Sequence, residues 1–173
     1  KQDLFTQYGV AAAYQAMKQS GLVSQGEGQN IDPFRLGVYF GSGIGGFATQ
    51  YREIAKMIED PSGQWISPLF IPTMISNIAA GHIAIMHHAE GPCLDIVTAC
   101  ATSTNAMGEA FRAIRNGYAD AIITGGCENA TIPIGIVGFA NAKALSRATD
   151  PKYASLPFNA NRAGFVMADG SAA

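Results

Sequence analysis

A buried strand, a helix and a second buried strand follow one another between residues 94 and 124, and this succession constrains the fold most. The apolar runs Leu94–Thr98 and Ala121–Thr124 predict the two strands. Because a helix over Thr102–Asn116 joins them, the strands are expected to be parallel. Four residues of that helix are predicted to face inward: Ala106, Ala110, Phe111 and Ile114. The chain is therefore predicted to form a mixed, layered α/β fold.

Further elements follow from periodicity and from residues that stop helices. A helix is predicted over Leu4–Gln19, with Asp3 as its N-cap and Gly21 as its end. A strand over Arg35–Phe40 leads through a glycine cluster into a helix over Phe47–Glu59. Three more predictions are a long, largely buried helix that begins near Pro72 and ends before Gly91-Pro92, a helix over Gly138–Ala144 and a strand-like run at Gly164–Met167.

Composition limits the classes of protein. With 173 residues, 48% of them hydrophobic, the chain can bury the core of one sizeable domain. A net charge of -2 gives no basic field for nucleic acid. No run approaches the roughly 18 apolar residues of a membrane span. Three cysteines, an odd number, favour reduced thiols and a cytoplasmic protein. Both ends of the chain look cut, which suggests a fragment.

Cys100 is the residue best placed for chemistry. It follows a predicted strand and opens the helix near Thr102. Free N–H groups and the positive end of the helix dipole stabilise a thiolate there, and the same groups could hold a thioester oxyanion. The alternative from local sequence is a small buried core residue. Cys93, after Gly-Pro, and Cys127, after Gly-Gly, start no helix and are interpreted as structural.

The segment Val97–Ala110 around Cys100 resembles the nucleophile segment of β-ketoacyl-acyl-carrier-protein synthases, the type II condensing enzymes especially. The resemblance covers nearly the whole chain. Further segments match that family in order: Gly41–Gly46, Ile66–Pro72, Asn77–His82, Tyr118–Asp120, Gly125–Glu128, Gly138–Phe139, Lys143–Ser146 and Pro157–Met167.

This resemblance implies a layered α/β/α thiolase fold made of two similar halves. Residues 1–173 would form most of the first half, incomplete at both ends. In that family the cysteine takes an acyl group from acyl carrier protein, and decarboxylated malonyl-carrier protein attacks the thioester. The two histidines and the lysine that assist lie in the second half, outside this chain. No cofactor or metal is implied.

The same resemblance assigns the walls of the acyl tunnel. Ile44, Ala130, Gly135 and Phe139 match tunnel positions, with Phe139 near the mouth beside the nucleophile. Phe70 resembles the residue that reaches the tunnel of a partner subunit, so a homodimer is implied. Without the resemblance, ordinary core packing would be the preferred interpretation of each.

The three histidines, His82, His87 and His88, precede the nucleophile strand and do not match the catalytic pair. They also lack the spacing of metal ligands, so a surface or interface role is favoured. The chain departs from many relatives at Ser103, Asn159 and Ala163, and at the end segment 168–172. These departures concern the polar support of the active-site loops and the precise subfamily.

Other interpretations remain open. Gly41, Gly43 and Gly46 match Gly-x-Gly-x-x-Gly between a strand and a helix, which is typical of dinucleotide binding, although the acid that should follow a second strand is missing. A polyketide ketosynthase, a non-catalytic thiolase-like scaffold and a cysteine hydrolase are the remaining alternatives. A chain-length factor is disfavoured because it lacks the nucleophilic cysteine that Cys100 supplies.

Overall fold

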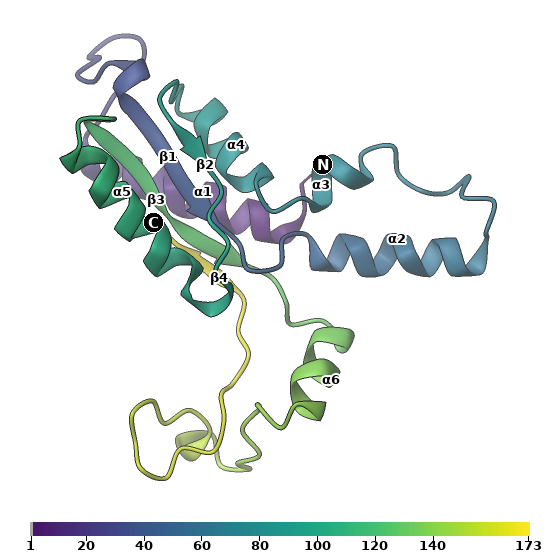
Figure 1. Cartoon of the computed structure of the whole chain (residues 1–173). Helices are drawn as coiled ribbons and strands as arrows, with labels where there is room; N and C mark the ends of the chain where they lie inside the picture. Colours follow the sequence, from purple (N-terminus) through teal and green to yellow (C-terminus); the bar gives the residue numbers. More distant parts are fainter. Residues whose placement is uncertain (1) are drawn as a thin grey trace. The chain divides into compact units, whose positions relative to one another are not determined.

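The computed structural model describes residues 2–173, and they form two compact units. The first unit comprises the chain up to Asn129 together with Gly170–Ala173, and the second is Ala130–Asp169. The first unit contains the sheet and most of the helices (Figure 1). The mixed α/β prediction is confirmed.

The first unit is built on a four-stranded sheet of order β2-β1-β3-β4. Its strands are β1 (Leu36–Gly41), β2 (Cys93–Leu94), β3 (Ala121–Glu128) and β4 (Gly170–Ala172). β1 pairs parallel with both β2 and β3, and β4 runs antiparallel to β3. β2 and β3 therefore run in the same direction, as predicted, but β1 lies between them. Since the carboxyl ends of parallel strands meet at one edge, the segments that follow β1 and β2 lie together there.

Helices cover both faces of this sheet, which explains why all six residues of β1 are buried. On one face, α1 (Leu4–Ser20) and α4 (Ile78–Met86) pack against β1 and β3. Phe5, Val38 and Ile83 are fully buried in that core. On the other face α5 (Thr102–Arg115) packs against Tyr39 through small side chains.

Two sequence predictions about α5 need correction. Phe111 and Ile114 do not face the sheet: the Phe111 side chain is 64% exposed. The sheet-facing side consists instead of Ala106, Ala110 and Ala113, which are buried. Small residues let the helix approach the sheet closely, so the larger apolar residues of the helical pattern turn outward.

The cap of α1 agrees with the sequence prediction. The Asp3 side chain accepts a hydrogen bond from Phe5 N, and Gly21 ends the helix with a φ of 71°. Asp3 also accepts hydrogen bonds from the backbone N–H and the hydroxyl of Thr49. The N-cap therefore joins the start of α1 to α2 (Phe47–Glu59).

The prediction of one long helix from Pro72 to just before Gly91 is wrong, because two helices occupy this region, α3 (Phe70–Met74) and α4, and α4 ends at Met86. Tertiary hydrogen bonds compete with the helical ladder at the break. Met74 O accepts from Gly46 N at 2.9 Å, and Ser76 Oγ donates to Asp95 at 2.5 Å. The backbone at Ile75 is extended, with a ψ of 140°.

Two strand predictions were also too long or misplaced. Of the run Leu94–Thr98 only Leu94 lies in a strand, β2, and the backbone N–H of Thr98 donates to Thr102 Oγ1 instead of a neighbouring strand. The run Gly164–Met167 makes only a single bridge, between Phe165 and Leu145, and β4 begins later. In both cases the amino-acid pattern shows an apolar, extended segment but does not show that the neighbouring segments are loops and not strands.

The second unit holds α6 (Pro133–Asn141), which starts and ends earlier than the predicted helix over Gly138–Ala144. Pro133 is at the first helical turn, where its missing N–H costs nothing. The backbone leaves the helix at Lys143, whose φ is 56°, and the Ala144 carbonyl accepts from Phe165 N at 3.0 Å. Asp169 Oδ1 joins the ends of the unit by accepting from Ala130 N and Thr131 N, at 2.9 and 3.0 Å.

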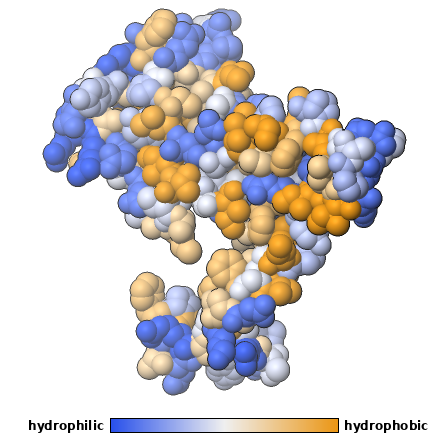
Figure 2. Space-filling model, turned by 45° about the vertical axis from the view of Figure 1, so that its right-hand side comes forward, coloured by the Kyte–Doolittle hydropathy of each residue, from blue (hydrophilic) through white to orange (hydrophobic). Residues whose placement is uncertain are grey.

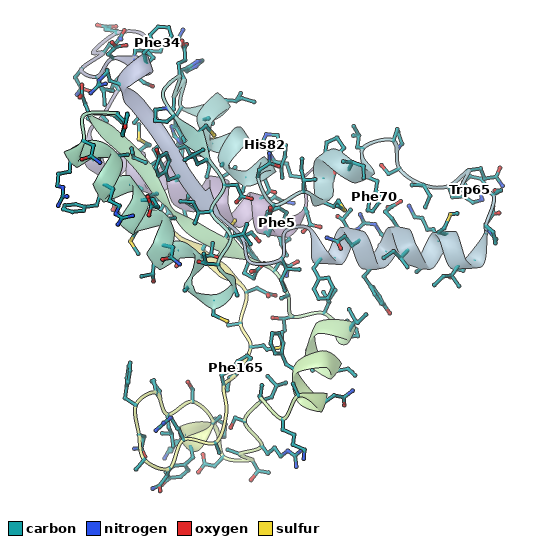
Figure 3. The ribbon with its side chains drawn as sticks, viewed as in Figure 1. Phe5, Phe34, Trp65, Phe70, His82 and Phe165 are labelled. Atoms are coloured by element: carbon teal, nitrogen blue, oxygen red, sulfur yellow. The ribbon has the colours of Figure 1, made fainter. Side chains whose placement is uncertain are left out.

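The loop between α2 and α3 is held by one buried carboxylate. The Glu53 side chain is 2% exposed and accepts hydrogen bonds from Ser67 N at 3.0 Å and Lys56 Nζ at 2.9 Å. Figure 3 shows this loop, with Trp65 at its outer end and Phe70 at the start of α3. The hydrogen bond from Ser67 N, followed by that from Lys56, lowers the pKa of Glu53 to about 2.

Acid should therefore loosen this loop. Glu53 has an ordinary pKa of 4.5, so its carboxylate stabilises the loop fully above that pH and loses this effect as pH falls toward 2. We expect the exchange protection factor of the Ser67 amide to fall over that window, and to be low at pH 7 in Glu53→Gln. In Glu59→Gln, which alters an exposed carboxylate of the same helix, protection should be unchanged; equal loss there would contradict the assignment.

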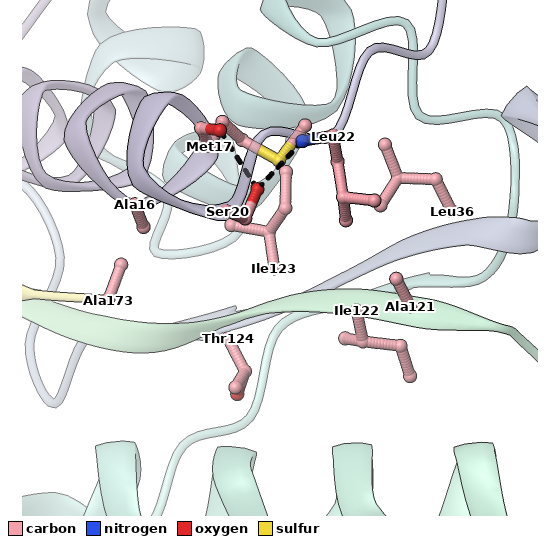
Figure 4. A pocket seen from close by; sticks show the side chains of 10 residues that line it. All are labelled: Ala16, Met17, Ser20, Leu22, Leu36, Ala121, Ile122, Ile123, Thr124 and Ala173. Atoms are coloured by element: carbon pink, nitrogen blue, oxygen red, sulfur yellow. Dashed lines mark hydrogen bonds between the residues drawn. The ribbon is translucent and has the colours of Figure 1, made fainter. Parts of the chain in front are cut away.

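A cavity of about 160 Å³ lies between the last turn of α1 and β3 (Figure 4). Met17, Ser20 and Ile123 are among the residues that line it. Ser20 Oγ is already engaged, since it donates to Met17 O and accepts from Leu22 N. The cavity borders the amino-terminal half of β3, Ala121–Thr124, and therefore lies away from the carboxyl ends of the strands.

Among residues 2–173, no helix is long and apolar enough to cross a membrane. Apolar side chains are nevertheless exposed in several clusters of the first unit (Figure 2). On α2 and the loop after it, the exposed large apolar residues are Tyr51, Ile54, Met57, Ile58 and Trp65.

Candidate active site around Cys100

Cys100 lies on a tight turn at the carboxyl edge of the sheet. The turn is a 3-10 helix, Ala99–Ala101, and α5 begins immediately after it at Thr102. The Cys100 side chain is exposed. The predicted placement at the start of a helix is confirmed, and the alternative of a buried core cysteine is wrong.

The backbone of this turn is strained. Ala99 has a φ of 52°, in the left-handed region that costs a non-glycine residue about 1–2 kcal/mol. Hydrogen bonds hold the turn in this conformation: Thr98 N donates to Thr102 Oγ1 at 2.9 Å, and Asn105 Nδ2 donates to Thr98 Oγ1 at 2.6 Å. Strain that is held in this way is typical of functional sites.

The partial positive charge at the amino end of α5 favours an anion beside Cys100. The N-cap residue is Ala101, which has no side-chain oxygen to bond the first N–H groups of the helix. Arg112 and Arg115 occupy the last turn, where they complement the other end of the dipole. The amino end of α5 therefore presents partial positive charge to a thiolate or to a thioester oxygen.

The glycines of the loop after β1 make room for the Cys100 turn. A Cβ on Gly41 would lie 2.0 Å from Ile96 O and 2.5 Å from Thr102 Cγ2. A Cβ on Gly43 would lie 3.4 Å from Ala99 O. The chain itself thus fills the space above Gly41 and Gly43, where a dinucleotide fingerprint would receive a pyrophosphate. This packing explains the glycine spacing without nucleotide binding.

Ser103, one of the departures from the family pattern, packs against the end of β3. A Cβ on Gly126 would lie 2.9 Å from Ser103 Cβ. The Ser103 side chain therefore has room only because β3 has a glycine at that position.

The sequence analysis did not predict a polar network that lies next to the Cys100 turn. Glu128, the last residue of β3, accepts from Ser42 Oγ at 2.9 Å and from Gly43 N at 2.8 Å. Gly45 N in turn donates to Ser42 Oγ at 2.8 Å. The only sequence signal was an acid directly after Gly125-Gly126-Cys127, at the expected end of a strand.

The other two cysteines differ from Cys100 in environment. Cys127 is 5% exposed on β3, and its sulfur would lie 3.1 Å from a Cβ on Gly9. Burial, followed by the charge of Glu128, raises the pKa of Cys127 to about 12. Cys93 is exposed at the start of β2, and burial of its thiol, followed by the charge of Asp95, raises its pKa. All three cysteines are free of disulfides, as the odd number predicted.

Alkylation should separate these thiols. In the native protein at pH 8 we expect iodoacetamide to modify Cys100 and to leave Cys127 unmodified, because Cys127 is both buried and a neutral thiol at that pH. Peptide mapping by mass spectrometry measures the modified fraction. Cys127 should react only after denaturation, and rapid native labelling of Cys127 would contradict the buried assignment.

The histidines lie apart from this turn, on or after α4. His82 and His87 are partly buried and His88 is exposed. Burial, followed by the nearby His88, lowers the pKa of His87. Within residues 2–173 no group of three His, Cys, Asp or Glu side chains is arranged to hold a metal ion. The surface or interface role of the three histidines stays a prediction.

The residues assigned to the acyl tunnel fall in both units. In the first unit, Ile44 is exposed in the loop after β1, next to Gly43, which faces Ala99. Phe70 is partly buried at the start of α3. In the second, Ala130 and Gly135 are buried, and the Phe139 ring meets Phe165 edge-on at 5.3 Å. Their tunnel role stays a prediction.

Comparisons with known proteins agree on one family. The model of the β-ketoacyl synthase amino-terminal domain matches residues 1–173. The chain is 44% identical over 172 residues to 3-oxoacyl-[acyl-carrier-protein] synthase 2 of Vibrio cholerae, and 42% identical to that of Staphylococcus aureus strain N315. Each alignment covers 99% of this chain but only 40% of the relative, so this chain spans about two fifths of the length of these relatives.

Solved structures give the same result. A β-ketoacyl synthase from Burkholderia phymatum superposes with a TM-score of 0.79 at 25% identity, over 96% of this chain and 40% of that chain. A type II polyketide-synthase ketosynthase, solved with its acyl carrier protein and bound to a hexaketide, superposes with a TM-score of 0.87 at 27% identity. The match covers 96% of this chain and 41% of that structure.

Proposed function

Because this chain belongs to the β-ketoacyl synthase family, through its amino-terminal domain, we propose that it is the first half of a 3-oxoacyl-acyl-carrier-protein synthase. The full-length protein would elongate acyl chains in fatty-acid synthesis. The observation that carries the proposal is the exposed thiol of Cys100 on a strained turn at the positive end of α5.

The proposed reaction uses the thiol twice. The Cys100 thiol gives up its proton, and the thiolate attacks the carbonyl carbon of an acyl thioester on acyl carrier protein. The new C–S bond forms, the C–S bond to the carrier breaks, and the carrier leaves as a thiolate that takes up the proton released by Cys100. The first N–H groups of α5 face the developing oxyanion. Malonyl-carrier protein then loses CO₂, its carbanion forms a C–C bond to the acyl carbon, and Cys100 leaves as thiolate. Histidines and a lysine beyond residue 173 would support decarboxylation.

The relatives by sequence favour fatty-acid over polyketide synthesis. The chain is 44% and 42% identical to two proteins named 3-oxoacyl-[acyl-carrier-protein] synthase 2. The polyketide ketosynthase was solved with an acyl carrier protein, which supports the same kind of partner here. A homodimer, in which Phe70 reaches the partner's tunnel, and a cytoplasmic location with reduced thiols complete the proposal.

Acylation in the full-length protein tests this function. Incubation with an acyl thioester of acyl carrier protein should add the mass of one acyl group per subunit, and peptide mapping should place it on Cys100. Further addition of malonyl-carrier protein should release a product longer by two carbons. Acyl addition at Cys93 or Cys127, or release of free fatty acid as the main product, would refute the condensing role.

Phe139 should control which acyl chains are accepted. We propose that its ring, held edge-on by Phe165, forms part of the wall near the tunnel mouth. In the full-length protein, Phe139→Ala should shift the profile of accepted chain lengths, because a smaller side chain enlarges an apolar pocket by the volume of the ring. Phe158→Ala, at a fully exposed ring of the same unit, is the control. An unchanged profile in Phe139→Ala would contradict the tunnel role.

A further inference from the structure

Asp95 lies between β2 and the Cys100 turn, and it is partly buried. Oδ2 accepts a hydrogen bond from Ser76 Oγ at 2.5 Å, a short distance that is typical of a charge-assisted bond. Oδ1 is shielded from solvent. The bond joins the break between α3 and α4 to the segment that carries the nucleophile, over 19 positions of sequence.

The contacts of Asp95 close a ring of three loops at the carboxyl edge of the sheet. Ser76 belongs to the loop whose Met74 O accepts from Gly46 N at 2.9 Å. The glycine loop is in turn packed against the Cys100 segment, because Gly41 leaves room for Ile96 O. Asp95 supplies the remaining link, from the Cys100 segment back to the Ser76 loop.

Linking the loops through a partly buried carboxylate carries a desolvation cost. Burial raises the pKa of Asp95, while the Ser76 hydroxyl and the Ser42 backbone N–H favour its charged form. A neutral side chain would join the loops without the desolvation cost. The carboxylate is therefore better explained by directional hydrogen bonding at a site that needs fixed geometry than by stability alone.

We propose that Asp95 is a positioning residue, which fixes the segment 95–99 through Ser76 so that Cys100 is presented to the acyl thioester. This inference rests on the proposed function. Asp95 acts through the backbone and does not touch the reacting atoms. Fixed nucleophile geometry matters because a misplacement of about 1 Å can slow a reaction roughly 100-fold.

The test compares acylation of Cys100 in full-length variants at saturating acyl-carrier protein. In Asp95→Ala the rate constant of acylation should fall about 10- to 100-fold, while the half-saturating carrier concentration stays within about twofold. Asp95→Asn should recover most of the rate, because the amide oxygen still accepts from Ser76. Ser76→Ala should lose rate like Asp95→Ala, and the double variant should lose no more than either.

The control is Asp120→Ala, which removes an exposed aspartate that pairs with Arg35 at 2.7 Å on the surface. It should acylate at the wild-type rate. All rates are measured below the melting temperature of every variant. If Asp95→Ala does not fold, the comparison of Ser76→Ala with wild type tests the proposal instead.

The outcomes are distinct. If Cys100 of the wild-type protein is not acylated, the proposed function is wrong. Wild-type acylation together with unchanged rates in Asp95→Ala and Ser76→Ala would overturn the positioning role alone. So would additive losses in the double variant, because independent effects would mean that the two side chains do not act through their bond.

Discussion

Replacing Cys100 by alanine in the full-length protein should abolish condensation, with the rate falling by about 10³-fold or more. The proposed reaction passes through a thioester on this sulfur, and alanine has no nucleophile to replace it. The fold should be retained, because the side chain is exposed and the hydrogen bonds that hold the turn join Thr98 to Thr102 and to Asn105. The measurement is the rate of 3-oxoacyl product formation from acyl- and malonyl-carrier protein.

Cys93→Ala is the matched control. Cys93 is also exposed, and it precedes Cys100 on the same segment of chain. Loss of its sulfur should leave the rate within about twofold of wild type, since changes at exposed positions rarely disturb a fold. Equal inactivation by both substitutions, or full activity of Cys100→Ala, would remove Cys100 from the mechanism.

Replacing Gly41 by alanine should destabilise the protein by about 3 kcal/mol or more, at the upper end of the usual cost of overpacking. The new Cβ would stand 2.0 Å from Ile96 O and 2.5 Å from Thr102 Cγ2. A backbone carbonyl cannot rotate away as a flexible side chain can, so the segment that carries Cys100 must shift. We therefore expect a lower free energy of unfolding in urea together with slower acylation of Cys100.

Gly108→Ala provides the opposite case within α5. A Cβ on Gly108 would meet no atom within 4 Å, and alanine favours the helix by about 0.5–1 kcal/mol. This variant should be slightly more stable than wild type and fully active. If Gly41→Ala were as stable as Gly108→Ala, the close packing of the Cys100 turn on the glycine loop would be wrong.

The sequence predicted elements well where local signals agree. Asp3 and Gly21 bound α1 as expected, and α2 runs over the predicted range Phe47–Glu59. The parallel direction of β2 and β3 followed from the helix that connects them, although β1 lies between the two strands. In these cases caps, periodicity and connection length are properties of neighbouring residues, which the sequence displays directly.

Predictions failed where residues distant in sequence compete for the backbone. The helix expected from Pro72 breaks because Gly46 and Asp95 bond to the loop at the break. Phe111 and Ile114 turn outward because alanines on the other side of α5 fit the sheet more closely. Hydrophobic spacing reveals which residues are apolar but not which of two apolar sides meets a partner.

Cys100 was identified from sequence because a cysteine between a strand and a helix is a local pattern. By itself, the sequence determined the mixed α/β class, the family and the thiol at the start of α5. Only the tertiary structure decided that Ala99 is strained, that Gly41 and Gly43 receive the Cys100 turn, and that Glu128 and Asp95 tie the surrounding loops together. The physical reason is range: caps and dipoles act within a few residues, whereas close backbone approach and buried hydrogen bonds join positions that only folding brings into contact.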